Sequence, residues 1–139
     1  MKKYMAIFFA LIGFAAFANG TATYRDAMGR NQGSSSTSGN RTTYRDAQGR
    51  LQGTAQTSNM GTTYRDAQGR LQGSSRTDTS GRTTYRDSMG RLQGTATTDS
   101  SGRITFRDAQ GRLQGTATTD SSGRVTYRDA QGRLHGTKK

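Results

Sequence analysis

An aromatic residue followed by arginine and aspartate recurs six times along this 139-residue chain. Aromatic rings and guanidinium groups that alternate in this way can stack on sugar rings or bases and hold anionic groups. In the alternative interpretation, the aromatic rings pack against leucines on the apolar face of a sheet. The candidate binding residues are Arg45, Arg65, Arg86, Arg107, Arg128, Tyr44, Tyr64, Tyr85, Phe106 and Tyr127.

The net charge of the chain predicts anionic partners. The sequence has 21 lysines and arginines against 9 acidic residues, all of them aspartate, and its formal net charge is +12. Such an excess is typical of proteins that bind polyanions, and the expected partners are lipopolysaccharide, acidic glycans or extracellular DNA. The alternative is that the arginines form only a solvated face that keeps the protein soluble.

The residue types argue against catalytic chemistry. The chain has one histidine, no cysteine and no glutamate, and its aspartates recur once per turn instead of converging. His135 replaces the glutamine of other copies and is interpreted as drift within the repeat. Calcium needs several oxygen ligands, whereas each turn offers one carboxylate beside an arginine. We therefore expect no enzymatic activity, no cofactor and no metal site.

The first eighteen residues have the features of a signal peptide. Lys2 and Lys3 precede an apolar run, and Ala16-Phe17-Ala18 has the small-x-small form of a cleavage site. The run is shorter than the roughly 20 residues of a transmembrane helix. We expect residues 1–18 to be removed and the mature chain to contain no transmembrane segment. The predicted location is the cell surface or the extracellular medium, with the periplasm as an alternative.

Residues 19–139 form six tandem repeats of about 20 to 21 residues, since the aromatic residues are spaced by 20, 20, 21, 21 and 21 positions. Each full unit carries two Asp-x-x-Gly turn signals. The threonine-rich runs between them favour strands. The pattern predicts an all-β protein in which tandem β-hairpins form an extended antiparallel meander.

The period of 21 predicts how the strands are paired. In a regular meander, a residue returns to the same face after 21 positions only if one loop of the unit is even in length and the other odd. A four-residue first loop would place Phe106 opposite Leu113. A three-residue second loop, with glycine in the left-handed conformation, would place Asp99 opposite Arg103 and Phe106 opposite Ala96.

This pairing predicts the two faces of the sheet. The aromatic residues, the leucines, Ile104 and Val125 would share one face, and the arginines and glutamines would share the other. The two 20-residue spacings fall where the second turn is altered. We therefore expect irregular or slipped turns at these two places.

Two other structural interpretations remain open at this stage. A β-solenoid would stack identical residues about 4.8 Å apart, and its columns of like charge favour the meander over it. A disordered cationic chain that orders only on contact is the other alternative, because only eight Leu, Ile, Val and Phe residues follow residue 18.

The repeated sequence resembles the YD repeat of Rhs and related bacterial surface proteins, whose units follow the pattern Y-x-Y-D-x-x-G-R-L with a period near 21. In one copy the matching residues are Tyr85, Asp87, Gly90, Arg91 and Leu92. The second tyrosine of the family pattern is arginine in every copy. The resemblance implies a β-hairpin unit and a secreted or cell-surface setting. Large family members wind a shell around a toxin, and six units are expected to be too few to enclose anything.

Two functions follow from these patterns. A single sheet with one thin apolar face is poorly stable alone, so it should curl, dimerise, stack or lie against a partner. The first function is an exported binding or structural protein that engages anionic or glycan polymers through its repeated arginine and tyrosine positions. The alternative is a subunit of a self-assembling extracellular fibre of the functional-amyloid kind.

Overall fold

The computed structural model describes residues 19–139, so the predicted signal peptide lies outside the described residues. Each repeat unit contributes two strands joined by a tight turn, because the Asp-x-x-Gly signals interrupt the threonine-rich runs about every ten residues. The strands are β1 (Gly20–Asp26), β2 (Asn31–Ser38), β3 (Arg41–Asp46), β4 (Leu51–Ser58), β5 (Gly61–Asp66), β6 (Leu71–Thr77), β7 (Arg82–Asp87), β8 (Leu92–Thr98), β9 (Ile104–Asp108), β10 (Leu113–Thr119), β11 (Val125–Asp129) and β12 (Leu134–Lys138).

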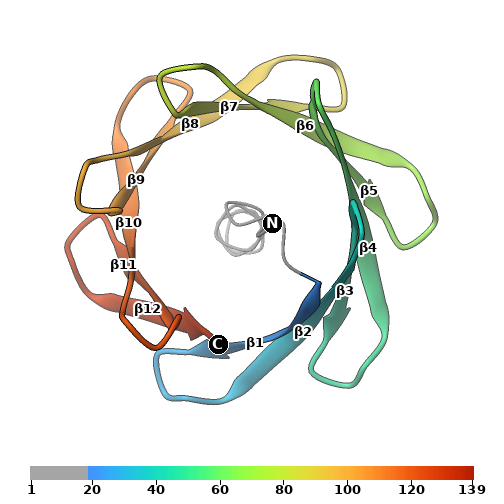
Figure 1. The fold of residues 1–139 in the computed structure, drawn as a ribbon, viewed down its shortest axis with the longest axis horizontal. Helices are drawn as coiled ribbons and strands as arrows, with labels where there is room; N and C mark the ends of the chain where they lie inside the picture. Colours follow the sequence, from blue (N-terminus) through green and yellow to red (C-terminus); the bar gives the residue numbers. More distant parts are fainter. Residues whose placement is uncertain (1–18) are drawn as a thin grey trace.

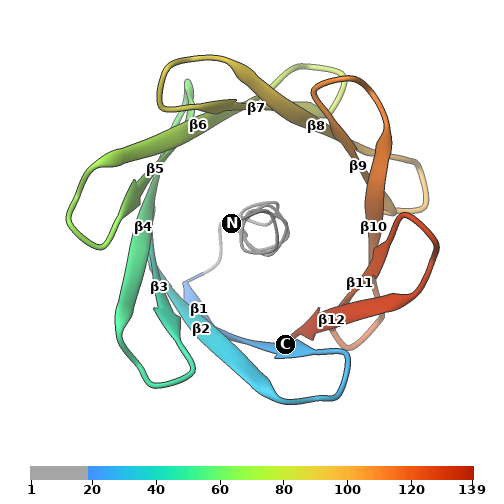
Figure 2. The same cartoon turned by 180° about the vertical axis from the view of Figure 1, so that it is seen from behind.

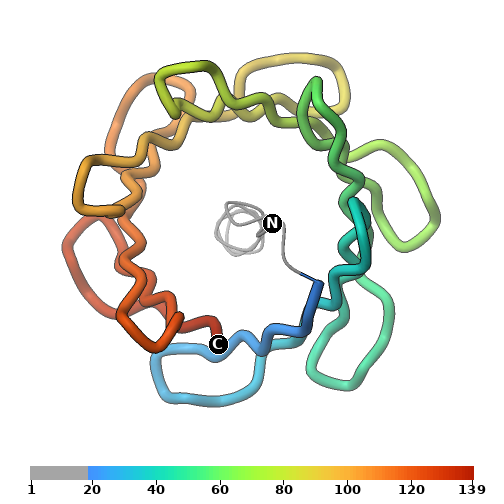
Figure 3. Tube along the Cα trace, in the orientation of Figure 1, coloured from blue at the N-terminus to red at the C-terminus, as the bar shows by residue number. Residues whose placement is uncertain are grey.

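The strands form one closed antiparallel barrel (Figure 1). Every strand pairs with its neighbours in the chain, and β1 pairs with β12 to close the ring, with Tyr24 opposite Lys138 and Asp26 opposite Gly136. The view from behind shows the same ring (Figure 2). The Cα trace passes once around it from the first unit to the last (Figure 3).

The barrel confirms the all-β hairpin architecture and corrects two expectations. The extended meander is wrong because the sheet closes on itself, and the solenoid is wrong because neighbouring strands are antiparallel and consecutive in sequence. Six units are also enough to enclose an interior. Closure pairs both edges of the sheet and turns its apolar face inward, which a flat sheet of this composition could not do alone.

The aromatic residues point into the barrel. The pKa of the Tyr44 hydroxyl is raised by desolvation and then by the proximity of other tyrosines, among them Tyr64 and Tyr85, whose strands are spread around the ring. The six aromatic residues are also only 4–9% exposed, as expected for side chains on the inner face of a closed sheet. Ile104 and Val125 are buried on the same face, as the sequence predicts. The buried aromatic residues are Tyr24, Tyr44, Tyr64, Tyr85, Phe106 and Tyr127.

The second turn of each 21-residue unit, with its intact Asp-x-x-Gly signal, matches the prediction. Asp99 N–H donates to the Arg103 carbonyl oxygen at 2.9 Å, Gly102 has φ of 79°, and Ala96 lies opposite Phe106. The two altered turns are shorter by one residue, and Ser58 pairs directly with Gly61 in one of them. The turns are thus irregular at these two places, as expected, while the strand register is kept on both sides of them.

The first turns and the leucines differ from the prediction. The loop after Asp108 also has three residues, with Asp108 N–H donating to the Arg112 carbonyl oxygen at 2.9 Å. Phe106 lies opposite Gly115, Leu113 lies opposite Arg107, and the register shifts between them. Each 21-residue unit therefore takes its odd length from a β-bulge rather than from an even loop. The bulge turns the leucines to the outer face, where they are 38–43% exposed.

A glycine follows each bulge and occupies a position that admits no side chain. Gly115 lies between Phe106 of its own unit and Asp129 of the next. A Cβ atom at Gly115 would overlap the carbonyl oxygen of Arg128. A Cβ atom at Gly136 would overlap the carbonyl oxygen of Arg25 in the same way, across the pair of strands that closes the barrel. The equivalent glycines are Gly33, Gly53, Gly73, Gly94, Gly115 and Gly136.

Candidate functional site

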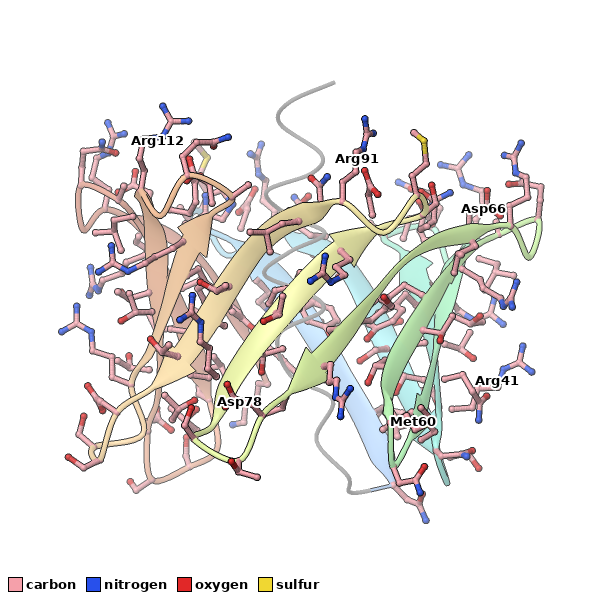
Figure 4. All side chains as sticks on the ribbon, turned by 90° about the horizontal axis from the view of Figure 1, so that it is seen from above. Arg41, Met60, Asp66, Asp78, Arg91 and Arg112 are labelled. Atoms are coloured by element: carbon pink, nitrogen blue, oxygen red, sulfur yellow. The ribbon has the colours of Figure 1, made fainter. Side chains whose placement is uncertain are left out.

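The six first turns gather at one end of the barrel, because all the strands that lead into them run in the same direction. We call this end the arginine rim and define it as the six turns together with the arginine that precedes each aspartate. In Figure 4 the labelled rim residues Asp66, Arg91 and Arg112 lie at one end, and Asp78 and Met60 lie at the other. The turns of the arginine rim are 26–30, 46–50, 66–70, 87–91, 108–112 and 129–133.

One carboxylate organises each turn of the rim. In the turn that starts at Asp87, Oδ1 accepts hydrogen bonds from the backbone N–H groups of Met89 and Arg91, each at 2.9 Å. Oδ2 accepts Nε of Arg91 at 2.8 Å and the side-chain amide of Gln93 at 3.2 Å. The same aspartate–arginine ion pair recurs in all six turns at 2.7–2.8 Å. Asp87 and its equivalents thus fix both the loop and a guanidinium group.

These contacts keep the rim carboxylates ionised. The hydrogen bond from the Arg91 side chain lowers the pKa of Asp87, desolvation opposes this shift, and the backbone N–H groups of Arg91 and Met89 reinforce it. The aspartate is therefore a charged acceptor throughout the neutral and mildly acidic range. The ionised carboxylate binds Nε of the arginine and so holds the side chain in place, while the Nη groups face outward.

The second arginine of each unit is fixed by the same turn. Nη1 of Arg86 donates to the carbonyl oxygen of Gly90 at 2.9 Å, and the glycine has φ of 81°, which an L-residue adopts only with strain. Arg91 remains 67% exposed although its Nε is bound to the aspartate. Each turn therefore presents two guanidinium groups in a defined position, with donors left for a ligand.

Charge is distributed unevenly between the two ends of the barrel. The rim carries twelve of the seventeen arginines and six of the nine aspartates, a net charge of +6. The other five arginines and three aspartates, together with Lys138 and Lys139 of the last strand, lie towards the opposite end and sum to +4. A ligand with many negative charges is therefore attracted most strongly to the rim.

The structure separates the two sets of candidate residues predicted from the sequence. Tyr64 and Arg65 are adjacent in β5, and because side chains alternate along a strand, the ring points inward and the guanidinium group outward. No face of the barrel brings the two types together. The outward set on the rim comprises Arg45, Arg65, Arg86, Arg107 and Arg128, and the inward set comprises Tyr44, Tyr64, Tyr85, Phe106 and Tyr127.

Two of the inward tyrosines are tied to serines on the next strand. The Tyr24 hydroxyl lies 3.0 Å from Oγ of Ser35, and the Tyr64 hydroxyl lies 2.9 Å from Oγ of Ser75. The hydroxyl of Tyr127 is buried and has no hydrogen-bond partner among the described residues. The rings lie opposite small residues, as Tyr64 lies opposite Ala55 and Gly73, so they pack on the inner face and not against the exposed leucines.

The rim also contains six arginines that the sequence-based list of candidates omits. Each follows the turn glycine, and each forms the ion pair with the aspartate four positions earlier. The spacing Asp-x-x-Gly-Arg was the signal, since a three-residue loop brings its first and last residues together. These arginines are Arg30, Arg50, Arg70, Arg91, Arg112 and Arg133.

The buried phenols predict a specific response to alkaline pH. Desolvation raises the pKa of Tyr64 to about 12, although hydrogen bonds from Ser75 and Thr62 oppose it. Burial shifts the pKa of Tyr24, Tyr44, Tyr85 and Tyr127 in the same direction. An unfolded tyrosine ionises near pH 10. Burial of the neutral phenols therefore contributes fully to the stability of the folded state below that pH, and this contribution is lost as pH rises towards the pKa values of the folded state.

We expect absorbance at 295 nm to stay low through pH 10 and then to rise together with the loss of the β signal in circular dichroism. The same titration in concentrated urea should give a gradual rise near pH 10. A gradual rise in the absence of urea, with the β signal intact, would contradict the inward placement of the tyrosines.

Several negative findings accompany this geometry. The described part of the chain contains no group of three or more His, Cys, Asp or Glu residues that could hold a metal ion. Between residues 19 and 139 there is no helix long and apolar enough to cross a membrane. No protein-family model matches the chain, and no curated protein matches it either.

Proposed function

We propose that this protein is exported and binds anionic polymers, such as acidic glycans, lipopolysaccharide or extracellular DNA, through its arginine rim. The observation that carries the proposal is the excess of fixed guanidinium groups at one end of the barrel, twelve against six carboxylates. Each arginine that neutralises an anionic group releases condensed counterions, which is the main source of affinity for a polyanion.

The ring arrangement suits a repetitive ligand. The rim turns share one geometry, since the aspartate–arginine distance varies only from 2.7 to 2.8 Å among them. A polymer that engages one turn meets the next at a high effective concentration. In this proposal the arginines bind and the tyrosines support the barrel that positions them.

The relationship to YD-repeat surface proteins remains part of the proposal. The matched Asp, Gly and Arg positions are the ones that build the rim turns, as Asp87, Gly90 and Arg91 illustrate. A fibre-forming role is not favoured by a specific observation, because every strand of residues 19–139 has two neighbours in the barrel.

The test compares charge removal at the two ends of the barrel. One variant carries Arg50→Gln, Arg70→Gln, Arg91→Gln and Arg112→Gln on the rim. The matched control carries Arg41→Gln, Arg82→Gln, Arg103→Gln and Arg124→Gln near the opposite end. Binding to double-stranded DNA of mixed sequence is measured over a range of salt concentrations, and circular dichroism verifies the fold of each variant.

We expect the rim variant to reduce the slope of log K against log salt by about 3 to 4, since each lost contact removes roughly 0.9. The control should change the slope by less than about 1. Equal reductions in the two variants, or binding of the unaltered protein that is insensitive to salt, would refute the assignment of the site.

A further inference from the structure

The exposed apolar side chains of the barrel are concentrated at the same end as its positive charge. Eight large hydrophobic residues are exposed in the described chain, and only Met60 belongs to the opposite end. Two positions of the repeat supply all the others: the residue after the turn arginine and the residue two positions after the aspartate. The seven in or directly after the rim turns are Met28, Leu51, Leu71, Met89, Leu92, Leu113 and Leu134.

The leucines form an apolar ring on the outer wall directly below the rim turns. Leu92 follows the turn arginine Arg91 and lies opposite Arg86 on the neighbouring strand. The bulge of each unit directs this residue outward rather than into the core. Five of the six units have leucine here, and the first unit has Asn31. Apolar and cationic side chains therefore alternate around one end of the barrel.

Two methionines extend beyond this ring. Met28 and Met89 occupy the same position in their turns, two residues after the aspartate, and their side chains are 78% and 73% exposed. The backbone N–H of each is bound to the aspartate carboxylate at 2.9 Å, so the turn holds the side chain outward. Four other units have glutamine at this position.

A soluble polyanion would engage the arginines but would gain nothing from the leucines and methionines. An anionic lipid surface offers both kinds of contact, because its phosphates lie at the surface and its acyl chains begin just beneath. Stable attachment to such a surface generally needs two signals, a cluster of basic residues and an apolar group that inserts. The arginine rim, with its net charge of +6, has both.

We propose that the barrel docks end-on onto an anionic lipid surface, with rim guanidinium groups on the headgroup phosphates and Met28 and Met89 inserted at the interface. The leucine ring follows at the level of the headgroups. This inference rests on the proposed function, since it names the kind of anionic surface that the rim recognises. The rest of the barrel has a net charge of +4 and a single exposed methionine, so the proposal fixes the orientation.

The first experiment measures sedimentation of the protein with vesicles. Vesicles of equal parts phosphatidylglycerol and phosphatidylcholine are compared with vesicles of phosphatidylcholine alone, and binding to double-stranded DNA is measured in parallel. The test variant carries Met28→Ser and Met89→Ser, and the control carries Met60→Ser. We expect the test variant to lose about tenfold in partition to the anionic vesicles. Its DNA binding should be unchanged, and the control should behave as the unaltered protein.

A second measurement reports insertion directly. The chain contains no tryptophan, so Met89→Trp introduces a single reporter at the rim and Met60→Trp introduces one at the opposite end. Fluorescence at position 89 should shift to shorter wavelength with anionic vesicles, and fluorescence at position 60 should not. The proposal is overturned if the two reporters shift equally, if neither shifts, or if the double serine variant binds vesicles as tightly as the unaltered protein.

The two proposals can fail separately. Salt-sensitive DNA binding without preference for anionic vesicles would refute lipid docking and leave the polyanion function in place. Absence of binding to both DNA and anionic vesicles would refute both.

Discussion

Alanine at Gly115 is expected to lower the free energy of unfolding by about 3 kcal/mol. The added Cβ would overlap the carbonyl oxygen of Arg128, a backbone atom that cannot move without disturbing the pairing of β10 with β11. The same residue lies opposite Phe106 on the other neighbouring strand. Urea unfolding followed by circular dichroism gives the value.

Thr116→Ala is the matched control for this substitution. Thr116 is the next residue of β10, is half-buried and points to the other face, so its replacement should cost about 1 kcal/mol or less. A cost for Gly115→Ala as small as that of the control would contradict the close approach between the units. A similar loss is expected for Gly136→Ala, because the equivalent contact crosses the closing strands to Arg25.

Removal of residues 134–139 should convert the closed barrel into an assembling chain. This segment contains β12, which pairs with both β11 and β1, so its loss leaves two unpaired strand edges at once. Exposed edges of this kind pair with other molecules. We expect loss of the cooperative thermal transition, together with light scattering and thioflavin T fluorescence that increase with protein concentration.

Lys139→Ala provides the control for the truncation. The backbone of residue 139 forms two hydrogen bonds with Thr23, at 2.6 and 3.0 Å, and the substitution keeps both of them. This variant should melt as the unaltered protein does. A truncated protein that remained monomeric with an unchanged melting temperature would show that β12 is not required for closure.

Local features of the fold could be predicted from the sequence because they depend on few residues. The turn from Asp99 to Arg103 follows from an aspartate that caps the loop and a glycine that adopts positive φ. The inward placement of Ile104 and Val125 follows from alternation along the strand. Both arguments need only neighbouring positions and the period of two.

Closure into a barrel could not be predicted in this way. It depends on the tilt and stagger accumulated over all the strands, which no single unit specifies. The predicted inward position of the leucines was wrong for a related reason. An odd period can arise from an even loop or from a bulge, and the choice is made by Gly115 and its equivalents, whose close contacts involve the following unit.

Only one of the two arginines of each rim turn could be predicted from the sequence. Arg86 belongs to the conspicuous aromatic-arginine pair and lies on the rim as an outward residue. Arg91 belongs to the turn, and its place beside Asp87 becomes visible only when the loop is known to contain three residues. A site formed jointly by arginine and tyrosine would require both side chains on the same face of the sheet. Adjacent residues of a strand point to opposite faces, so the two cannot form such a site.

One repeat unit supplies two strands, one running in each direction. Any number of whole units therefore gives an even number of strands, and the first strand meets the last in the antiparallel sense that β1 and β12 show. An insertion or loss of half a unit would bring two parallel strands to that junction. A barrel that is antiparallel at every junction can therefore change its circumference only in steps of two strands, and gain or loss of a complete unit is the smallest change that keeps it so.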